Sequence, residues 1–187
     1  MIYILKMNFL VKLLLENEMS NFTKYKLAEE WLNAAVNILR ENFLLHGYIV
    51  PDVLISVGFG IKGHKPNSSR HFLGYCHPKC FSESGINEIY ISPFLTDPLE
   101  LIYTISHELV HVLDDCRNGH GYKFKKIAKH IRHPDCGYLS ELEKLQTEVL
   151  YRSIADDIGH YPRKGVKYEF GFNIPNPYYM DRPVRWV

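Results

Sequence analysis

The sequence predicts an α+β fold in which one helix precedes a small sheet of about three strands, and further helices follow. Three observations predict this order: an early stretch with helical period, then short β-branched runs broken by glycine, then long segments with helix-capping residues. The chain has 187 residues, a length that suits one domain with a sizeable core. We place that domain at 21–161, between a poorly defined N-terminal segment, 1–20, and an extended C-terminal tail, 162–187.

The composition is that of a soluble globular protein, with 46% hydrophobic and 23% charged residues. Because the formal net charge is only +1, any attraction to nucleic acid must come from a local basic patch. The chain has four cysteines, and a domain of this size does not need disulfides. A reducing compartment, the cytoplasm, is therefore the simpler expectation.

The N-terminal segment 1–20 is apolar but does not have the pattern of a signal peptide. Lys12 and Glu16 interrupt its apolar run, and no small-residue cleavage site follows. It is also too short and too charged to span a membrane. We expect no membrane partner here, but an extra short helix or a start codon placed too early, with Met7 and Met19 as other possible starts.

The first predicted helix covers Lys24 to His46 and ends at Gly47. Its apolar residues recur at helical spacing: Leu27, Trp31, Ala34, Ala35, Ile38, Leu39 and Phe43. Three runs then read as strands, because β-branched residues are bounded by glycine, proline and polar loops: 53–57, 71–76 and 86–93.

The next helix is predicted to start at Thr96, Asp97 and Pro98, where Thr96 or Asp97 can cap the free N–H groups and proline suits the first turn. It runs through "LELIYTISHELVHVLDD" with an apolar stripe on one side. Two more helices are predicted at "YKFKKIAKHIR" and at "SELEKLQTEVLYRSIADDIG", where Ser140 and Glu143 match a capping box.

The predicted helix 99–115 contains His107, Glu108 and His111 in the pattern HExxH. Residues four apart leave the same face of a helix, so the two imidazoles can bind one zinc ion. The glutamate of this pattern reaches the attacking water and acts as a general base. The alternative is an ordinary helix with solvent-facing histidine and glutamate.

A hydrolytic zinc site takes three protein ligands and keeps a fourth position for water. His120 is the favoured third ligand, because Gly119 and Gly121 beside it permit a sharp return of the chain. Asp114 and Asp115 are too close in sequence to fold back easily, and they suit supporting or surface roles better. Rival ligands lie on the later helix: Glu141, Glu143 and Glu148.

The block from Leu73 to Ile131 resembles the SprT-like (Spartan-type) zinc metallopeptidase family, especially its small phage-encoded members. The stretches that carry the resemblance are "LGYC", "NEIYISPFLTDPLELIYTISHELVHVL" and "GHGYKFKKIAKHI". The resemblance implies a zincin-like fold and a zinc metalloendopeptidase in the cytoplasm, that of the host if the chain is phage-encoded. It also implies Zn²⁺ ligands at His107, His111 and His120 and a catalytic Glu108.

This chain departs from the family pattern in two ways. The spacing from His111 to His120 is shorter than in the long Spartan proteases, and no cysteine follows Cys136, so we expect no C-terminal zinc ribbon. The family is similar to proteases that cleave proteins attached to DNA, but that substrate does not transfer directly without the DNA-binding parts. Two alternatives stay open: a non-catalytic zinc-stabilised module that binds nucleic acid or a replication protein, and a zinc hydrolase of a non-peptide amide.

Weaker signals concern two further stretches. "CHPKC", Cys76 to Cys80, has the spacing of a zinc knuckle, but no second pair follows, so a strand cysteine and a loop cysteine are the simpler interpretation. The stretch Lys123–His133 is basic, and one stripe of it could contact the phosphates of DNA: Lys123, Lys126 and His130. A solvated helix face is the common alternative.

Two expectations concern the substrate. If the strand Asn87–Pro93 lies at a sheet edge, it could hold an extended peptide by backbone pairing. Tyr122 and Tyr138 could stabilise an oxyanion, although nothing in their spacing selects them.

Overall fold

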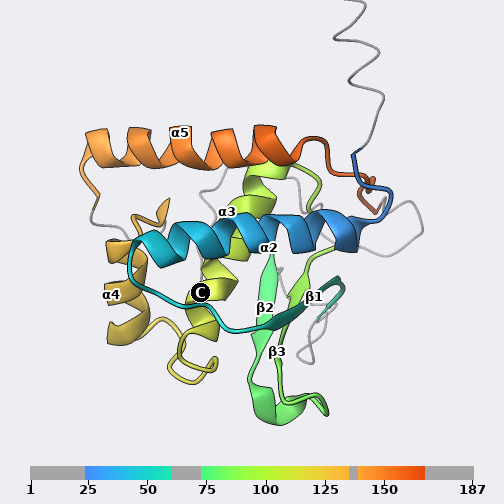
Figure 1. The fold of residues 1–187 in the computed structure, drawn as a ribbon, viewed down its shortest axis with the longest axis horizontal. Helices are drawn as coiled ribbons and strands as arrows, with labels where there is room; N and C mark the ends of the chain where they lie inside the picture. The colour runs from blue at the N-terminus through green and yellow to red at the C-terminus, as the bar shows by residue number, and fades with distance from the viewer. Residues whose placement is uncertain (1–23, 60–72, 135–138, 167–187) are drawn as a thin grey trace, which may run out of the picture.

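The structure, a computed structural model, describes residues 24–59, 73–134 and 139–166. It has the α+β class and the order of helix, strands and helices that the sequence predicts (Figure 1). In chain order the elements are α2 (Ala28–Leu45), β1 (Val53–Val57), β2 (Gly74–His77), the 3-10 helix η1 (Lys79–Phe81), β3 (Asn87–Ile91), α3 (Pro98–Val112), α4 (Tyr122–His130) and α5 (Glu141–Ile158). Among the helices of these described ranges, none has the length and apolar character needed to cross a membrane.

The three strands form one mixed sheet in the order β1–β3–β2. β1 runs parallel to β3, with Val53 opposite Asn87, and β2 runs antiparallel to it, with Gly74 opposite Ile91. β3 is therefore the central strand, and both of its edges are already paired. The peptide-binding edge considered for Asn87–Pro93 cannot lie there, and the outer strand beside α3 is β2.

The caps of the helices α3 and α5 are those predicted. The Asp97 carboxylate accepts a hydrogen bond from the Glu100 backbone N–H at 2.9 Å, and Pro98 opens α3. In α5, the Ser140 hydroxyl accepts from the Glu143 N–H at 3.3 Å, and the Glu143 carboxylate accepts from the Ser140 N–H at 2.8 Å. Both caps satisfy amide groups that the first turn of a helix leaves without partners.

Helix α3 is the centre of the packing, because it contacts α2, α4, α5, β2 and β3. Figure 1 shows it passing behind α2, between α5 and the sheet. The sequence predicts an apolar stripe with a polar side, but α3 is buried on nearly all sides between Leu101 and Val112. The side that carries His107 and Glu108 is therefore also interior, which an apolar stripe alone does not predict.

Two buried polar contacts join the helices. The indole N–H of Trp31 on α2 donates to the Gly159 carbonyl at 2.8 Å, and the Tyr161 ring packs edge-on against Trp31 with centroids 5.2 Å apart. The hydroxyl groups of Ser106 on α3 and Tyr151 on α5 lie 2.7 Å apart. The packed helical layer thus extends to Tyr161, which is 1% exposed.

Segment 1–20 and most of the predicted tail, 167–187, lie outside the described residues.

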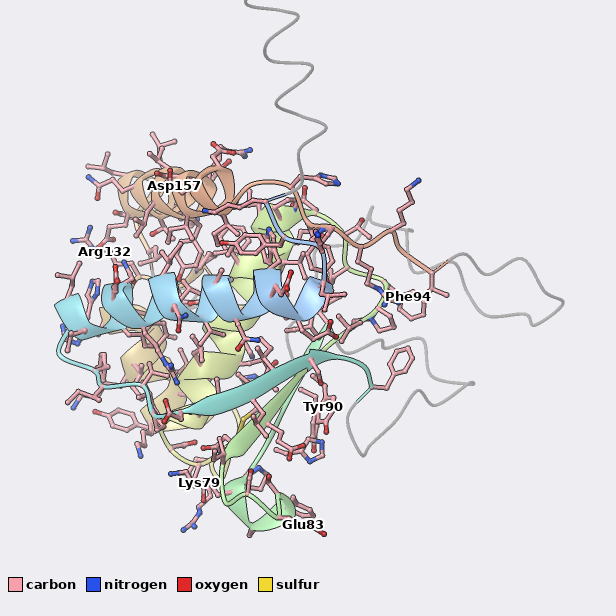
Figure 2. The ribbon with its side chains drawn as sticks, turned by 45° about the vertical axis from the view of Figure 1, so that its right-hand side comes forward. Lys79, Glu83, Tyr90, Phe94, Arg132 and Asp157 are labelled. Carbon is pink, nitrogen blue, oxygen red and sulfur yellow. A yellow bond between two sulfur atoms is a disulfide. The ribbon has the colours of Figure 1, made fainter. Side chains whose placement is uncertain are left out.

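Cys76 of β2 and Cys116, just after α3, form a disulfide. The expectation that a domain of this size has no disulfide is therefore wrong, because packing brings β2 next to the end of α3 and so joins cysteines 40 residues apart. Figure 2 draws it in yellow, and shows Lys79 and Glu83 toward the hairpin tip, away from Arg132 and Asp157. In "CHPKC", Cys76 is a paired strand cysteine, and Cys80 is an exposed free thiol that lies in the 3-10 helix η1 and not in the loop expected for it.

Candidate metal centre

Three histidines meet at the C-terminal half of α3. The Nε2 atom of His120 lies 2.9 Å from Nε2 of His107 and 3.2 Å from Nε2 of His111. The three ligand atoms lie within 4.8 Å of one another, close enough to hold one metal ion. Within the described parts of the chain, this is the one cluster of histidine, cysteine or carboxylate side chains with that property.

The local backbone explains how the three side chains meet. His107 and His111 lie on one face of α3 because they are four residues apart. His120 comes from the loop between α3 and α4. Gly119 has a positive φ of 49°, and a Cβ on Gly121 would lie 3.0 Å from the Asn118 carbonyl oxygen. The positive φ favours glycine at residue 119 and the close carbonyl favours it at residue 121, so both glycines ease the sharp return of the chain.

The ring of Phe124, in the first turn of α4, contacts all three imidazoles. Its centroid lies 4.8 Å from that of His107, 4.6 Å from that of His111 and 4.7 Å from that of His120. Phe124 is 6% exposed, so it forms an apolar wall against the cluster. Such a wall limits the rotation of the three rings and excludes water from one side of them.

The two histidines of α3, His107 and His111, are neutral at physiological pH. Burial, with a smaller contribution from the charge of His120, lowers the pKa of His107 to about 3. Burial also lowers the pKa of His111 to about 3, with smaller effects from the other two histidines, while Asp114 opposes the shift. Neutral imidazole has the lone pair that a metal ion needs.

Glu108 points into the packing between α3 and β2. It is 5% exposed, and burial raises the pKa of its carboxyl to about 8. The carboxylate lies against Gly74 of β2, where an added Cβ would be 2.7 Å from Oε1 of Glu108 and 2.7 Å from Cγ2 of Thr104. Gly74 is therefore a residue of the site that spacing arguments missed, although a glycine inside a strand is a known signal of close approach.

The rival glutamates on α5 have other partners. Glu141 pairs with Lys144 at 2.6 Å, and Glu148 pairs with Arg152 at 2.9 Å. Glu143 is the N-terminal cap partner of Ser140. The structure thus brings His120, and none of these glutamates, to the histidine pair.

Two tyrosines were considered as groups that stabilise an oxyanion. Tyr122 is 82% exposed, which gives that role no support. Tyr138 lies outside the described residues.

His133 is not part of the basic surface that the sequence predicts for 123–133. It is fully buried, its Nε2 atom lies 3.2 Å from the Tyr103 carbonyl oxygen, and its ring centroid lies 5.7 Å from that of His107. It therefore supports the packing behind His107 and cannot contact a partner. The lysines of α4 are exposed as expected: Lys123, Lys125, Lys126 and Lys129.

The donor set fits a zinc ion. Around tetrahedral zinc with Zn–N bonds of about 2.0–2.1 Å, neighbouring nitrogens lie about 3.3 Å apart. The two shortest Nε2 separations in the cluster, 2.9 and 3.2 Å, are close to that value. Three imidazoles, with a buried carboxylate next to the first of them in sequence, are the ligands and base of hydrolytic zinc sites.

Comparisons with protein-family models, with curated proteins and with solved structures found no match to this chain. The function of the chain is therefore inferred from the geometry of this cluster and from the motifs of the sequence.

Proposed function

We propose that this chain is a zinc metalloendopeptidase of the SprT-like, zincin type, with ligands His107, His111 and His120 and general base Glu108. The observation that carries the proposal is the meeting of three imidazoles, two of them on the same helix as a buried glutamate. Three histidines leave one position of a tetrahedral ion for water or substrate, as in catalytic zinc sites.

The metal would lower the pKa of the attacking water to about 7 and polarise the substrate carbonyl. Glu108 takes one proton from that water as its oxygen forms a bond to the peptide carbon. The C–N bond then breaks, and Glu108 gives the proton to the leaving amine, so that one water is consumed and no other reactant is needed. The burial that raises the pKa of Glu108 supports this role, because a carboxyl group with a pKa near neutrality can both accept and return a proton.

The decisive experiment compares wild type with Glu108→Gln in zinc content and in cleavage of an unfolded protein. We expect about one zinc per chain in both, and a loss of cleavage of at least about a hundredfold in the variant. Glu148→Gln, on the exposed side of α5, is the matched control and should behave as wild type.

Other results would support the alternatives. If Glu108→Gln cleaved protein as fast as wild type, the proposal would be wrong. Zinc binding with no cleavage of any protein, together with unfolding in chelator, would favour the non-catalytic module that binds nucleic acid or a replication protein. Cleavage only of small amides would favour the non-peptide hydrolase.

For the substrate we propose proteins associated with DNA, because a basic helix directly follows the third histidine. The segment 122–133 has no acidic residue, and its lysines are exposed. The sequence predicts that one stripe of this helix contacts phosphates. In that stripe the ring of His130 is hydrogen-bonded to the Tyr48 hydroxyl at 3.0 Å, so Lys123 and Lys126 are the residues available to bind phosphates. Such contacts weaken as salt rises, because counterions are released on binding.

The substrate proposal is tested with the double variant Lys123→Glu/Lys126→Glu, and with Lys164→Glu as an exposed control. We expect the double variant to bind DNA more weakly, with a shallower dependence on salt, and to cleave DNA-bound protein more slowly. Its cleavage of unbound protein should stay at the wild-type rate. Equal DNA binding by wild type and the double variant would contradict the assignment.

A further inference from the structure

The loop 113–121 between α3 and α4, which carries His120, begins in an unfavourable backbone conformation. Asp115 and Cys116 both have positive φ, 59° and 55°. For residues with a Cβ this conformation is unfavourable, because the Cβ approaches the following carbonyl oxygen. The positive φ values turn the chain back at the end of α3. Two backbone hydrogen bonds close this turn: the Cys116 N–H donates to the His111 carbonyl at 2.9 Å, and the Asp115 N–H donates to the Val112 carbonyl at 3.0 Å. A turn in such a conformation persists only if other contacts determine it.

Packing on the solvent side of the loop does not supply the contacts that determine this turn. The outer side of the loop faces a hollow in the surface, whose lining includes five loop residues: Leu113, Asp114, Asp115, Arg117 and Asn118. Arg117 reaches over this side and pairs with Oδ2 of Asp115 at 2.9 Å, but its side chain is 73% exposed. An exposed ion pair of this kind contributes little.

The contacts that hold the turn come from the sheet side, and they include the disulfide between Cys116 and Cys76 of β2. Oδ1 of Asp115 accepts from the Lys79 backbone N–H at 2.9 Å and from Nδ2 of Asn87 at 3.0 Å. Asn87, the first residue of β3, is fully buried and also donates to the His77 carbonyl at 3.1 Å. These bonds to a carboxylate are charge-assisted, and they lower the pKa of Asp115. They join the end of α3 to all the elements of the β2–β3 hairpin.

We infer that Asp115 and Asn87 are positioning residues for the third metal ligand. By fixing the turn after α3 on the hairpin, they hold the loop so that His120 returns to His107 and His111. The inference rests on the proposed metal site. It adds that the affinity of this site for zinc depends on an anchor that is not a ligand and does not touch one.

The test is a double-mutant cycle on zinc affinity, measured by competition with a chelator of known affinity. The Cys76–Cys116 disulfide is reduced in every variant, so that this bond does not hold the turn. Asp115→Gly removes the carboxylate while glycine still accepts the positive φ, so backbone strain is not the cause of any effect. We expect Asp115→Gly to weaken zinc binding by roughly tenfold, and Asn87→Ala to act in the same direction. In a His120→Ala background, Asp115→Gly should have no further effect, because the ligand that it positions is absent.

Two controls separate positioning from general damage. Arg117→Ala keeps both Oδ1 contacts and should stay within about twofold of wild type. Asp115→Asn keeps an acceptor oxygen and tolerates positive φ, so it should recover most of the affinity. Thermal unfolding of the metal-free proteins reports whether each variant is folded.

The outcomes distinguish the inference from the proposed function. If wild type bound no zinc, the proposed metal site would be wrong and the positioning role would fail with it. If wild type bound zinc and Asp115→Gly bound it equally well, only the positioning role would be overturned. An equal loss in the His120→Ala background would also overturn it, because the effect would then not act through His120.

Discussion

Gly74 and Glu108 are in contact across the boundary between β2 and α3, and the contact leaves no room for a side chain on residue 74. A Cβ there would lie 2.7 Å from Oε1 and 2.8 Å from Cγ of Glu108. Real Cβ atoms do not approach other heavy atoms so closely, so the glutamate or the strand would have to move. The outer strand of the sheet thus determines where the proposed general base lies.

We therefore expect Gly74→Ala to lower peptide cleavage by at least about tenfold, since small displacements of a catalytic group are costly. Zinc content should stay near wild type, because the three atoms nearest to an added Cβ belong to Glu108 and Thr104 and not to a histidine. The measurements are steady-state cleavage and zinc per chain. Gly58→Ala is the matched control, since its Cβ would meet only the edge of the Tyr90 ring, at 3.2 Å. Equal loss of activity in both variants would show that the effect is not specific to Glu108.

The apolar wall behind the histidines gives a second prediction. Phe124 contacts the three imidazole rings with centroid distances of 4.6–4.8 Å. Phe124→Ala would leave a cavity there and let the rings rotate, so zinc affinity should fall by roughly tenfold or more. The cavity also lowers the free energy of unfolding by about 3–5 kcal/mol. Phe124→Leu, which fills most of the volume, should retain more of both quantities, and equal zinc affinity in all three proteins would contradict the role.

The buried contact between Ser106 and Tyr151 gives a third prediction. Their hydroxyl oxygens lie 2.7 Å apart between α3 and α5. Tyr151→Phe leaves the buried Ser106 hydroxyl without this partner, and should lower the free energy of unfolding by about 1–2 kcal/mol. Removing both groups, in Ser106→Ala/Tyr151→Phe, should cost less than the sum of the single changes. Urea unfolding of the four proteins measures this, and strict additivity would show that the two hydroxyls do not interact.

The helices and most strand positions follow from local features of the sequence. Helical period and the capping residues Asp97 and Ser140 place α2, α3 and α5 within a few residues of their observed limits. The strand runs around Val53 and Asn87 are likewise found where β-branched residues are dense. Local signals suffice because caps and side-chain periodicity act within one element.

What the sequence does not predict depends on contacts between distant residues. The central place of β3, the burial of the polar side of α3 and the overlap of Gly74 with Glu108 follow from how the elements pack. The positive φ of Asp115 and the bond between Cys76 and Cys116 have no local signal either, because partners from the hairpin stabilise them. Of the candidate site, the histidines were predictable from spacing, but their supporting residues were not.

The raised pKa of Glu108 predicts how stability depends on pH in the metal-free protein. Burial raises the pKa from 4.5 to about 8, so between these values the folded protein holds a proton that the unfolded chain releases. The contribution of Glu108 to stability is therefore greatest below pH 4.5 and is lost as the pH rises to about 8. Glutamine has the same shape and does not titrate, so metal-free Glu108→Gln should be more stable than wild type above pH 8, by an amount on the order of 3–5 kcal/mol.

Chemical unfolding in excess chelator, at several values between pH 4.5 and 9, checks this prediction. His107 and His111 act in the opposite direction, because their lowered pKa values make stability fall as the pH drops from 6.5 toward 3. They are present in both proteins, so their effect cancels in the difference. Zinc should shrink the difference at pH 8, since its positive charge favours the ionised glutamate. A difference that is the same at every pH would show that Glu108 is not held in a buried, protonated state.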